Sequence, residues 1–143
     1  MTIEIFARDK DETLNRALTV WLCRLSGLAL FGMGLLYWTR LIGIYDGDLW
    51  RFDLMPVWWR VAAPALAVMY PVAGIGLWMT TSWGTVIWVL IAAIEGVMRM
   101  GFPHLFGAEP AIVGLHIFGL VLLAVLRIVS AFESRRRTSP RRV

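Results

Sequence analysis

Four long apolar runs, separated by short polar segments, constrain this chain more than any other feature. They cover residues 17–43, 57–79, 84–102 and 110–131. Each run is long enough to cross about 30 Å of hydrocarbon at the helical rise of about 1.5 Å per residue. Only helices and closed barrels satisfy their backbone groups in lipid. The runs therefore predict an all-α fold, an integral membrane bundle of four antiparallel transmembrane helices.

Composition agrees with lipid as the solvent of this chain. Of its 143 residues 59% are hydrophobic, whereas soluble domains average about 45–50%. We predict a single four-helix transmembrane domain, 1–143, with no room for a separate soluble domain. Segment 1–16 mixes acids with bases and lacks the apolar centre of a cleavable signal peptide, so we expect it to remain as an N-terminal tail. Segment 132–143 is expected to be a basic, disordered tail.

Basic residues are concentrated next to the two ends of the chain, and the loop over residues 45–56 holds three aspartates. Under the positive-inside rule this bias predicts that both tails are in the cytoplasm. An even number of spans agrees, because it puts both tails on the same side of the membrane. The basic run after the fourth span directly follows a membrane helix. We therefore expect it to contact anionic lipid rather than nucleic acid.

Arginine and tryptophan side chains near the ends of the spans are typical of interface anchors, because arginine stems snorkel and indole rings favour the headgroup region. The predicted anchors are Arg24, Arg40, Trp58, Trp59, Trp78, Arg127, Arg135, Arg136 and Arg137. Tyr37 and Trp38 fit the same aromatic belt.

Glu95, Arg99 and His116 are the candidate functional residues of the spans. Glu95 and Arg99 are one helical turn apart and share a face of the third span. His116 lies at a depth similar to that of Arg99, because the third and fourth spans are antiparallel. Intramembrane ionisable groups usually face the interior of a bundle, so the three predict a polar cluster. It is either a functional site or a structural pair with a histidine bonded to a neighbouring backbone.

A histidine beside a carboxylate suits proton transfer or the binding of a quinone headgroup. Because His116 is the one histidine within the spans, a haem held from both sides within one chain is not expected. The sequence contains none of the P-loop, nucleophile-elbow, zinc-protease or dinucleotide motifs that we sought. We predict no metal site and no cofactor, with a quinone as the alternative. The sequence leaves open whether the protein is an enzyme, and the missing motifs favour a protein that is not.

Small residues recur within the runs, and Ala92 and Gly96 form a small-xxx-small pair that predicts close approach of another helix. The single cysteine, Cys23, is expected to be a small buried residue, and it cannot form an internal disulfide.

The first run resembles the first helix of the DoxX-like small membrane proteins, through residues 24–34, RLSGLALFGMG, and the following Arg40. Residues 72–79, VAGIGLWM, resemble that family's second helix. The chain is also similar to small four-span proteins of alphaproteobacteria grouped as a domain of unknown function. The first resemblance implies a subunit near quinone-linked or thiol redox chemistry, and the second implies a bundle of the bacterial inner membrane. Neither transfers a catalytic residue.

Three functions follow as alternatives. The first is an accessory or scaffold subunit of an inner-membrane complex, which implies a membrane protein partner or a homo-oligomer. The second is a quinone-linked redox subunit that uses Glu95, Arg99 and His116. The third is a minimal transporter acting as an oligomer, because a single bundle of four helices is too narrow for an aqueous pore.

Overall fold

The computed structural model describes the backbone of residues 2–138 and the side chains of residues 14–132, 134 and 135. This part of the chain is helical and contains no strand. The elements in order are α1 (Thr2–Ile42), α2 (Val57–Trp78), α3 (Ser82–Gly96), the π-helical turn η1 (Val97–Gly101), α4 (Pro103–Phe106) and α5 (Pro110–Thr138).

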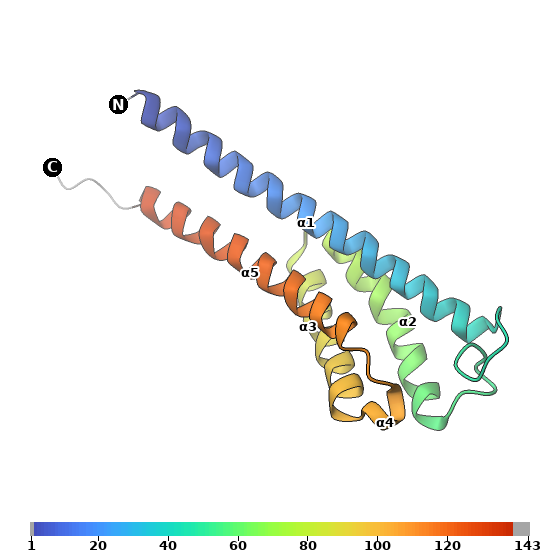
Figure 1. The fold of residues 1–143 in the computed structure, drawn as a ribbon. Helices are drawn as coiled ribbons and strands as arrows, with labels where there is room; N and C mark the ends of the chain where they lie inside the picture. The colour runs from blue at the N-terminus through green and yellow to red at the C-terminus, as the bar shows by residue number, and fades with distance from the viewer. Residues whose placement is uncertain (1, 139–143) are drawn as a thin grey trace.

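Among the residues that the structure describes, four helical segments are long and apolar enough to cross a membrane: Leu14–Ile42, Val57–Trp78, Ser82–Gly101 and Pro110–Phe132. Consecutive spans run in opposite directions, and the start of α1 and the end of α5 lie at the same end of the bundle (Figure 1). The predicted all-α bundle of four membrane helices is therefore confirmed, with boundaries within three residues of those expected.

The described parts of the two segments expected to be tails are helical. Helix α1 begins at Thr2, so nearly all of segment 1–16 continues the first span as helix, and α5 continues to Thr138 into the segment expected to be disordered. Adding a residue to an existing helix requires no new nucleation, and alanine and arginine favour helix. Residues 139–143 lie outside the described residues.

Glycines let the α1 and α2 backbones approach each other closely. A Cβ added to Gly27 would lie 2.8 Å from the carbonyl oxygen of Gly74, and one added to Gly74 would lie 2.7 Å from the carbonyl oxygen of Gly27. Gly96 differs, because a Cβ there meets no atom within 4 Å. Within the described chain, Gly96 of the predicted Ala92–Gly96 pair is thus not in close contact with another helix.

The end of the bundle opposite the termini is covered by the loop between α1 and α2. Arg60 donates hydrogen bonds of 2.8 Å to the carbonyl oxygens of Asp53 and Met55, which draws the loop onto the start of α2. Met55, near the end of this loop, is buried. Trp58 donates a 3.0 Å hydrogen bond to the Leu105 carbonyl, which ties α2 to α4.

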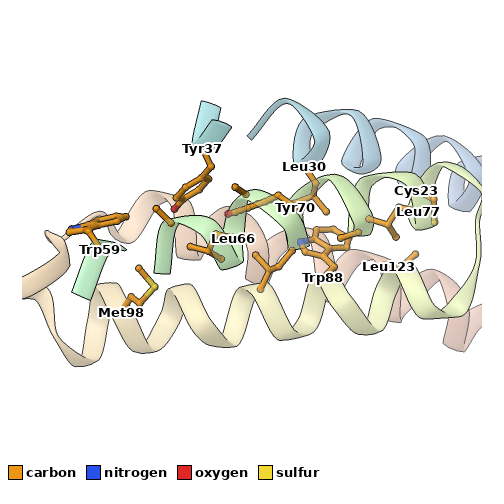
Figure 2. Packing of buried hydrophobic residues seen from close by; sticks show 14 of the residues in the cluster. Cys23, Leu30, Tyr37, Trp59, Leu66, Tyr70, Leu77, Trp88, Met98 and Leu123 are labelled. Carbon is orange, nitrogen blue, oxygen red and sulfur yellow. The ribbon is translucent and has the colours of Figure 1, made fainter. Parts of the chain in front are cut away.

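Buried residues follow one seam along each helix. In α1 the buried positions include Cys23, Gly27, Leu30, Gly34 and Tyr37, spaced alternately by four and three residues. This spacing is that of helices packed side by side in a left-handed bundle. Figure 2 shows that residues of the seams from all four spans meet in one core.

Candidate functional site

Glu95 lies in the last turn of α3, and its side chain is fully buried in the bundle. Its Oε1 accepts a 2.8 Å hydrogen bond from the Tyr37 hydroxyl of α1. Its Oε2 lies 3.6 Å from Nε of Arg99 and 3.6 Å from Nε2 of His116. These separations are longer than hydrogen bonds, and Oε2 has no hydrogen-bond partner among the described residues. The carboxylate therefore keeps one oxygen close to two basic groups.

Arg99 connects this buried carboxylate to the surface. Its Nη1 lies 2.6 Å from Oε2 of Glu109, the last residue of the loop before α5. The Arg99 side chain is 4% exposed and that of Glu109 is 60% exposed. Arg99 lies within η1, and single π-helical turns in α-helices occur frequently at functional sites. Glu109, Arg99 and Glu95 therefore form a line of charged groups from the loop before α5 to the buried carboxylate.

His116 belongs to α5, and its imidazole ring contacts polar groups of two other helices, one at each ring nitrogen. The indole Nε1 of Trp88 donates a 3.0 Å hydrogen bond to its Nδ1, and its Nε2 lies 3.1 Å from the hydroxyl of Tyr70. An indole N–H can only donate, so Nδ1 must be the unprotonated nitrogen. The imidazole is consequently neutral, and its proton is on Nε2, facing Tyr70 and Glu95.

The two tyrosines complete the site between α1 and α2. Their rings stack with centroids 5.5 Å apart and planes inclined by 21°. Figure 2 shows Tyr37, Tyr70 and Trp88 inside the bundle between the spans. Every span contributes to what we call the polar cluster, which consists of Tyr37, Tyr70, Trp88, Glu95, Arg99 and His116.

An apolar crevice borders the polar cluster on the side of α1 and α5. It has a volume of about 380 Å³, and its lining includes Leu30, Met33 and Phe118 together with Trp88 and His116. The two helices are joined nearer the termini, where the Asn15 amide donates a 2.8 Å hydrogen bond to Ser130. The crevice lies within the spanning segments, so a molecule entering it from the bilayer would meet hydrocarbon side chains and the edge of the cluster.

The candidates predicted from the sequence are brought together. Glu95, Arg99 and His116 lie in one cluster with the contacts given above. Tyr37 was expected at the interface, but it is 2% exposed and bonded to Glu95. Trp88 and Glu109 were not singled out. A sequence signal could have indicated that Tyr37 and Trp88 face the interior. Tyr37 lies seven residues, or two helical turns, after Leu30 on the same face of α1, and Trp88 lies seven residues before Glu95 on the same face of α3.

Most of the predicted interface anchors whose side chains the structure describes are exposed, and one of them is buried in the core. Arg24 is exposed and lies over the exposed ring of Trp78 at 5.6 Å, and exposed Arg127 donates to the hydroxyl of Thr85. Trp58 is also exposed. Trp59, by contrast, belongs to the core and contacts Phe106 edge to face. Arg135 is exposed, and the side chains of Arg136 and Arg137 lie outside those that the structure describes.

Arg40, also a predicted anchor, lies against aromatic rings of α1, α2 and the loop between them. Its guanidinium carbon lies 5.4 Å from the ring centroid of Tyr37, 4.8 Å from that of Trp50 and 6.0 Å from that of Trp59. Its Nε is buried and has no hydrogen-bond partner among the described residues.

Comparison with known proteins gives the family but no activity. A family model described as a family of unknown function, DUF6163, matches residues 17–134, and the chain belongs to this family. No curated protein and no solved structure matches the chain. The matched residues include every member of the polar cluster.

Proposed function

We propose that this member of the DUF6163 family is a non-enzymatic accessory subunit of a membrane complex. The observation that carries the proposal is the open space beside three glycines of the spans. A Cβ added to Gly32, Gly96 or Gly114 would meet no atom within 4 Å. The chain's own packing therefore does not require glycine there, whereas a partner helix that approaches closely would.

The internal pairing of the polar cluster supports the same role. Glu95 is bonded to Tyr37 and lies beside Arg99, and Arg99 pairs with Glu109. Contacts of this kind between spans fix how the helices sit against one another. A rigid bundle of this size presents a defined surface to a partner.

Leucine substitutions at the open glycines test the proposal. Gly114→Leu adds a side chain on α5 at a position where a Cβ meets no atom of the chain within 4 Å, and Val121→Leu is the matched control at an exposed position of the same helix. We expect native mass spectrometry in nanodiscs to show the wild type and Val121→Leu with a bound partner or second copy, and Gly114→Leu without it. A wild type that is strictly monomeric when gently extracted from its own membrane would overturn the proposal.

A second candidate is a quinone-linked redox subunit, in line with the DoxX-like resemblance of residues 24–34 and 72–79. The observation that favours it is that His116 and Trp88 of the polar cluster line the α1–α5 crevice. An isoprenoid quinone is lipid-soluble, and its long apolar chain matches the crevice lining. The residues of the cluster would contribute hydrogen bonds and a polar connection from Glu109 through Arg99 and Glu95 to His116. Electrons would come from a redox partner subunit.

Four variants separate the two candidates. Glu95→Gln, Arg99→Met and His116→Phe alter the cluster, and Ala29→Phe fills the crevice, with Ala124→Phe as an exposed control on α5. The redox role predicts that the complex assembles with these variants while quinone-dependent electron flow fails in all but the control. Loss of protein level alone, without a specific loss of electron flow, would instead assign the cluster a structural role.

We also propose a bacterial inner-membrane location with both termini in the cytoplasm, and contact of the basic C-terminal segment with anionic lipid. The excess of arginine next to the termini supports this orientation. Phosphatase and fluorescent reporter fusions after residue 143 and within the 43–56 loop test it. Phosphatase activity should appear only for the loop fusion, and the reverse result would invert the topology.

A further inference from the structure

Arg40 keeps a charge that no described residue of this chain pairs with. Its neighbours at this end of the bundle are engaged: Arg51 donates to both oxygens of Asp53, and Arg60 donates to two loop carbonyls. Arg99 pairs with Glu95 and Glu109. No carboxylate or carbonyl of the described residues accepts a hydrogen bond from Arg40, although Asp46 and Asp48 lie in the adjoining loop.

Three aromatic rings hold this guanidinium in place. They come from different segments, Tyr37 from α1, Trp50 from the loop and Trp59 from α2. Attraction between a cation and aromatic faces stabilises the position of the charge. The rings do not provide acceptors for the planar set of N–H donors that arginine carries. The site is therefore preorganised for an oxyanion, whose oxygens match the guanidinium fork.

The depth of Arg40 indicates where the oxyanion comes from. Arg40 lies in the last turn of α1, at the end of the Leu14–Ile42 span, where phospholipid phosphates lie. Exposed Ile42, Ile44 and Trp58 belong to the same end of the spans. Exposed apolar side chains at the same end of the spans as a cation suit a lipid with acyl chains better than a free ion.

We propose that Arg40, with Trp50 and Trp59 beside it, binds the phosphodiester of an anionic phospholipid in the leaflet opposite the termini. This site is separate from the basic C-terminal end of α5, which lies at the other end of the bundle (Figure 1). It is also independent of the proposed subunit role, since it requires no protein partner.

Titration calorimetry of the full chain in neutral detergent tests the site with dihexanoyl phosphatidylglycerol as the probe. Arg40→Met should weaken binding by at least about tenfold, the value expected for loss of one charge-assisted hydrogen-bonding group. Arg24→Met is the matched control, because it removes an exposed arginine over one indole ring at the opposite end. It should bind the lipid as the wild type does.

Trp50→Leu distinguishes a built site from simple charge attraction. It keeps the arginine but removes the nearest ring, and it should also weaken binding. Circular dichroism and thermal melting of each variant establish that it is folded, and Arg40→Lys provides a milder change if Arg40→Met unfolds. Wild-type affinity in Arg40→Met, or equal loss in Arg24→Met, would overturn the proposal. Inorganic phosphate is the second probe, and binding as tight as that of the lipid would assign the site to a free anion instead.

Discussion

The indole N–H of Trp88 and Nδ1 of His116 are joined by a 3.0 Å hydrogen bond between α3 and α5. This contact decides which imidazole nitrogen carries the proton, because tryptophan can only donate. A doubly protonated His116 would have to break it. The side chain that links Glu95 to the crevice is thus held neutral, in one tautomer, by a residue that carries no charge.

Nitrogen NMR of the histidine side chain tests this tautomer. His104 is exposed, so His104→Gln leaves His116 as the only histidine without disturbing the core. We expect an unprotonated Nδ1 and a protonated Nε2 in this background. Adding Trp88→Phe removes the donor and should yield a mixture of tautomers. A protonated Nδ1 with Trp88 intact would contradict the geometry described here.

Gly119 makes room for the same tryptophan. A Cβ at this position would lie 2.7 and 2.8 Å from carbons of the Trp88 ring. Gly119→Ala therefore forces the indole to move, and overpacking of this kind destabilises by about 1–3 kcal/mol. Gly114→Ala on the same helix meets no atom, so it should be neutral or stabilising by up to about 1 kcal/mol. Unfolding in mixed micelles with increasing dodecyl sulfate compares the two, and equal stabilities would refute the packing.

The four spans and the shared helical face of Glu95 and Arg99 could be predicted from the sequence, whereas the sequence left open whether His116 faces them. Apolar runs of about 20 residues have few alternatives in lipid. Glu95 and Arg99 share a helical face in any straight helix. These inferences depend only on local spacing along the chain.

Tyr37, Arg40 and Trp59 could not be placed in the same way. Their spans are hydrophobic on all sides, so the apolar pattern does not fix the rotation of the helix. Aromatic and arginine residues near the end of a span serve equally as interface anchors or as inward groups. Tertiary contacts decide which of the two positions each residue takes. Tyr37 donates a hydrogen bond to Glu95 of another helix, and Trp59 packs on Phe106.

The loop between α1 and α2 should loosen in acid. The Arg51 guanidinium hydrogen-bonded to Asp53 lowers the pKa of that carboxyl. A folded-state pKa below the unfolded value means that the pair stabilises the loop above the unfolded pKa, about 3.9 for aspartate. This contribution is lost as the pH falls through the folded pKa.

Hydrogen exchange at the amides of Leu54 and Met55, which donate to the Arg51 carbonyl, measures this loosening. Corrected for intrinsic exchange, protection should fall with acidity in the wild type. Asp53→Asn should have lower protection at neutral pH and little further loss in acid, whereas Asp46→Asn serves as a control that keeps the pair. Unchanged protection of the wild type in acid would show that the pair does not hold the loop.

The Glu95–Arg99 pair is expected to show strong coupling between its two members. Glu95→Leu leaves the buried Tyr37 hydroxyl without its acceptor and Arg99 with only the surface carboxylate of Glu109. Removing one member of a buried pair costs about 3–5 kcal/mol. The double variant Glu95→Leu/Arg99→Leu removes both charges, so it should be less destabilised than the sum of the single variants. Glu109→Gln, at an exposed position, should cost less than Glu95→Leu. Additive effects in a double-mutant cycle, measured by unfolding in mixed micelles, would show that Glu95 and Arg99 act independently and that the polar cluster is not a unit.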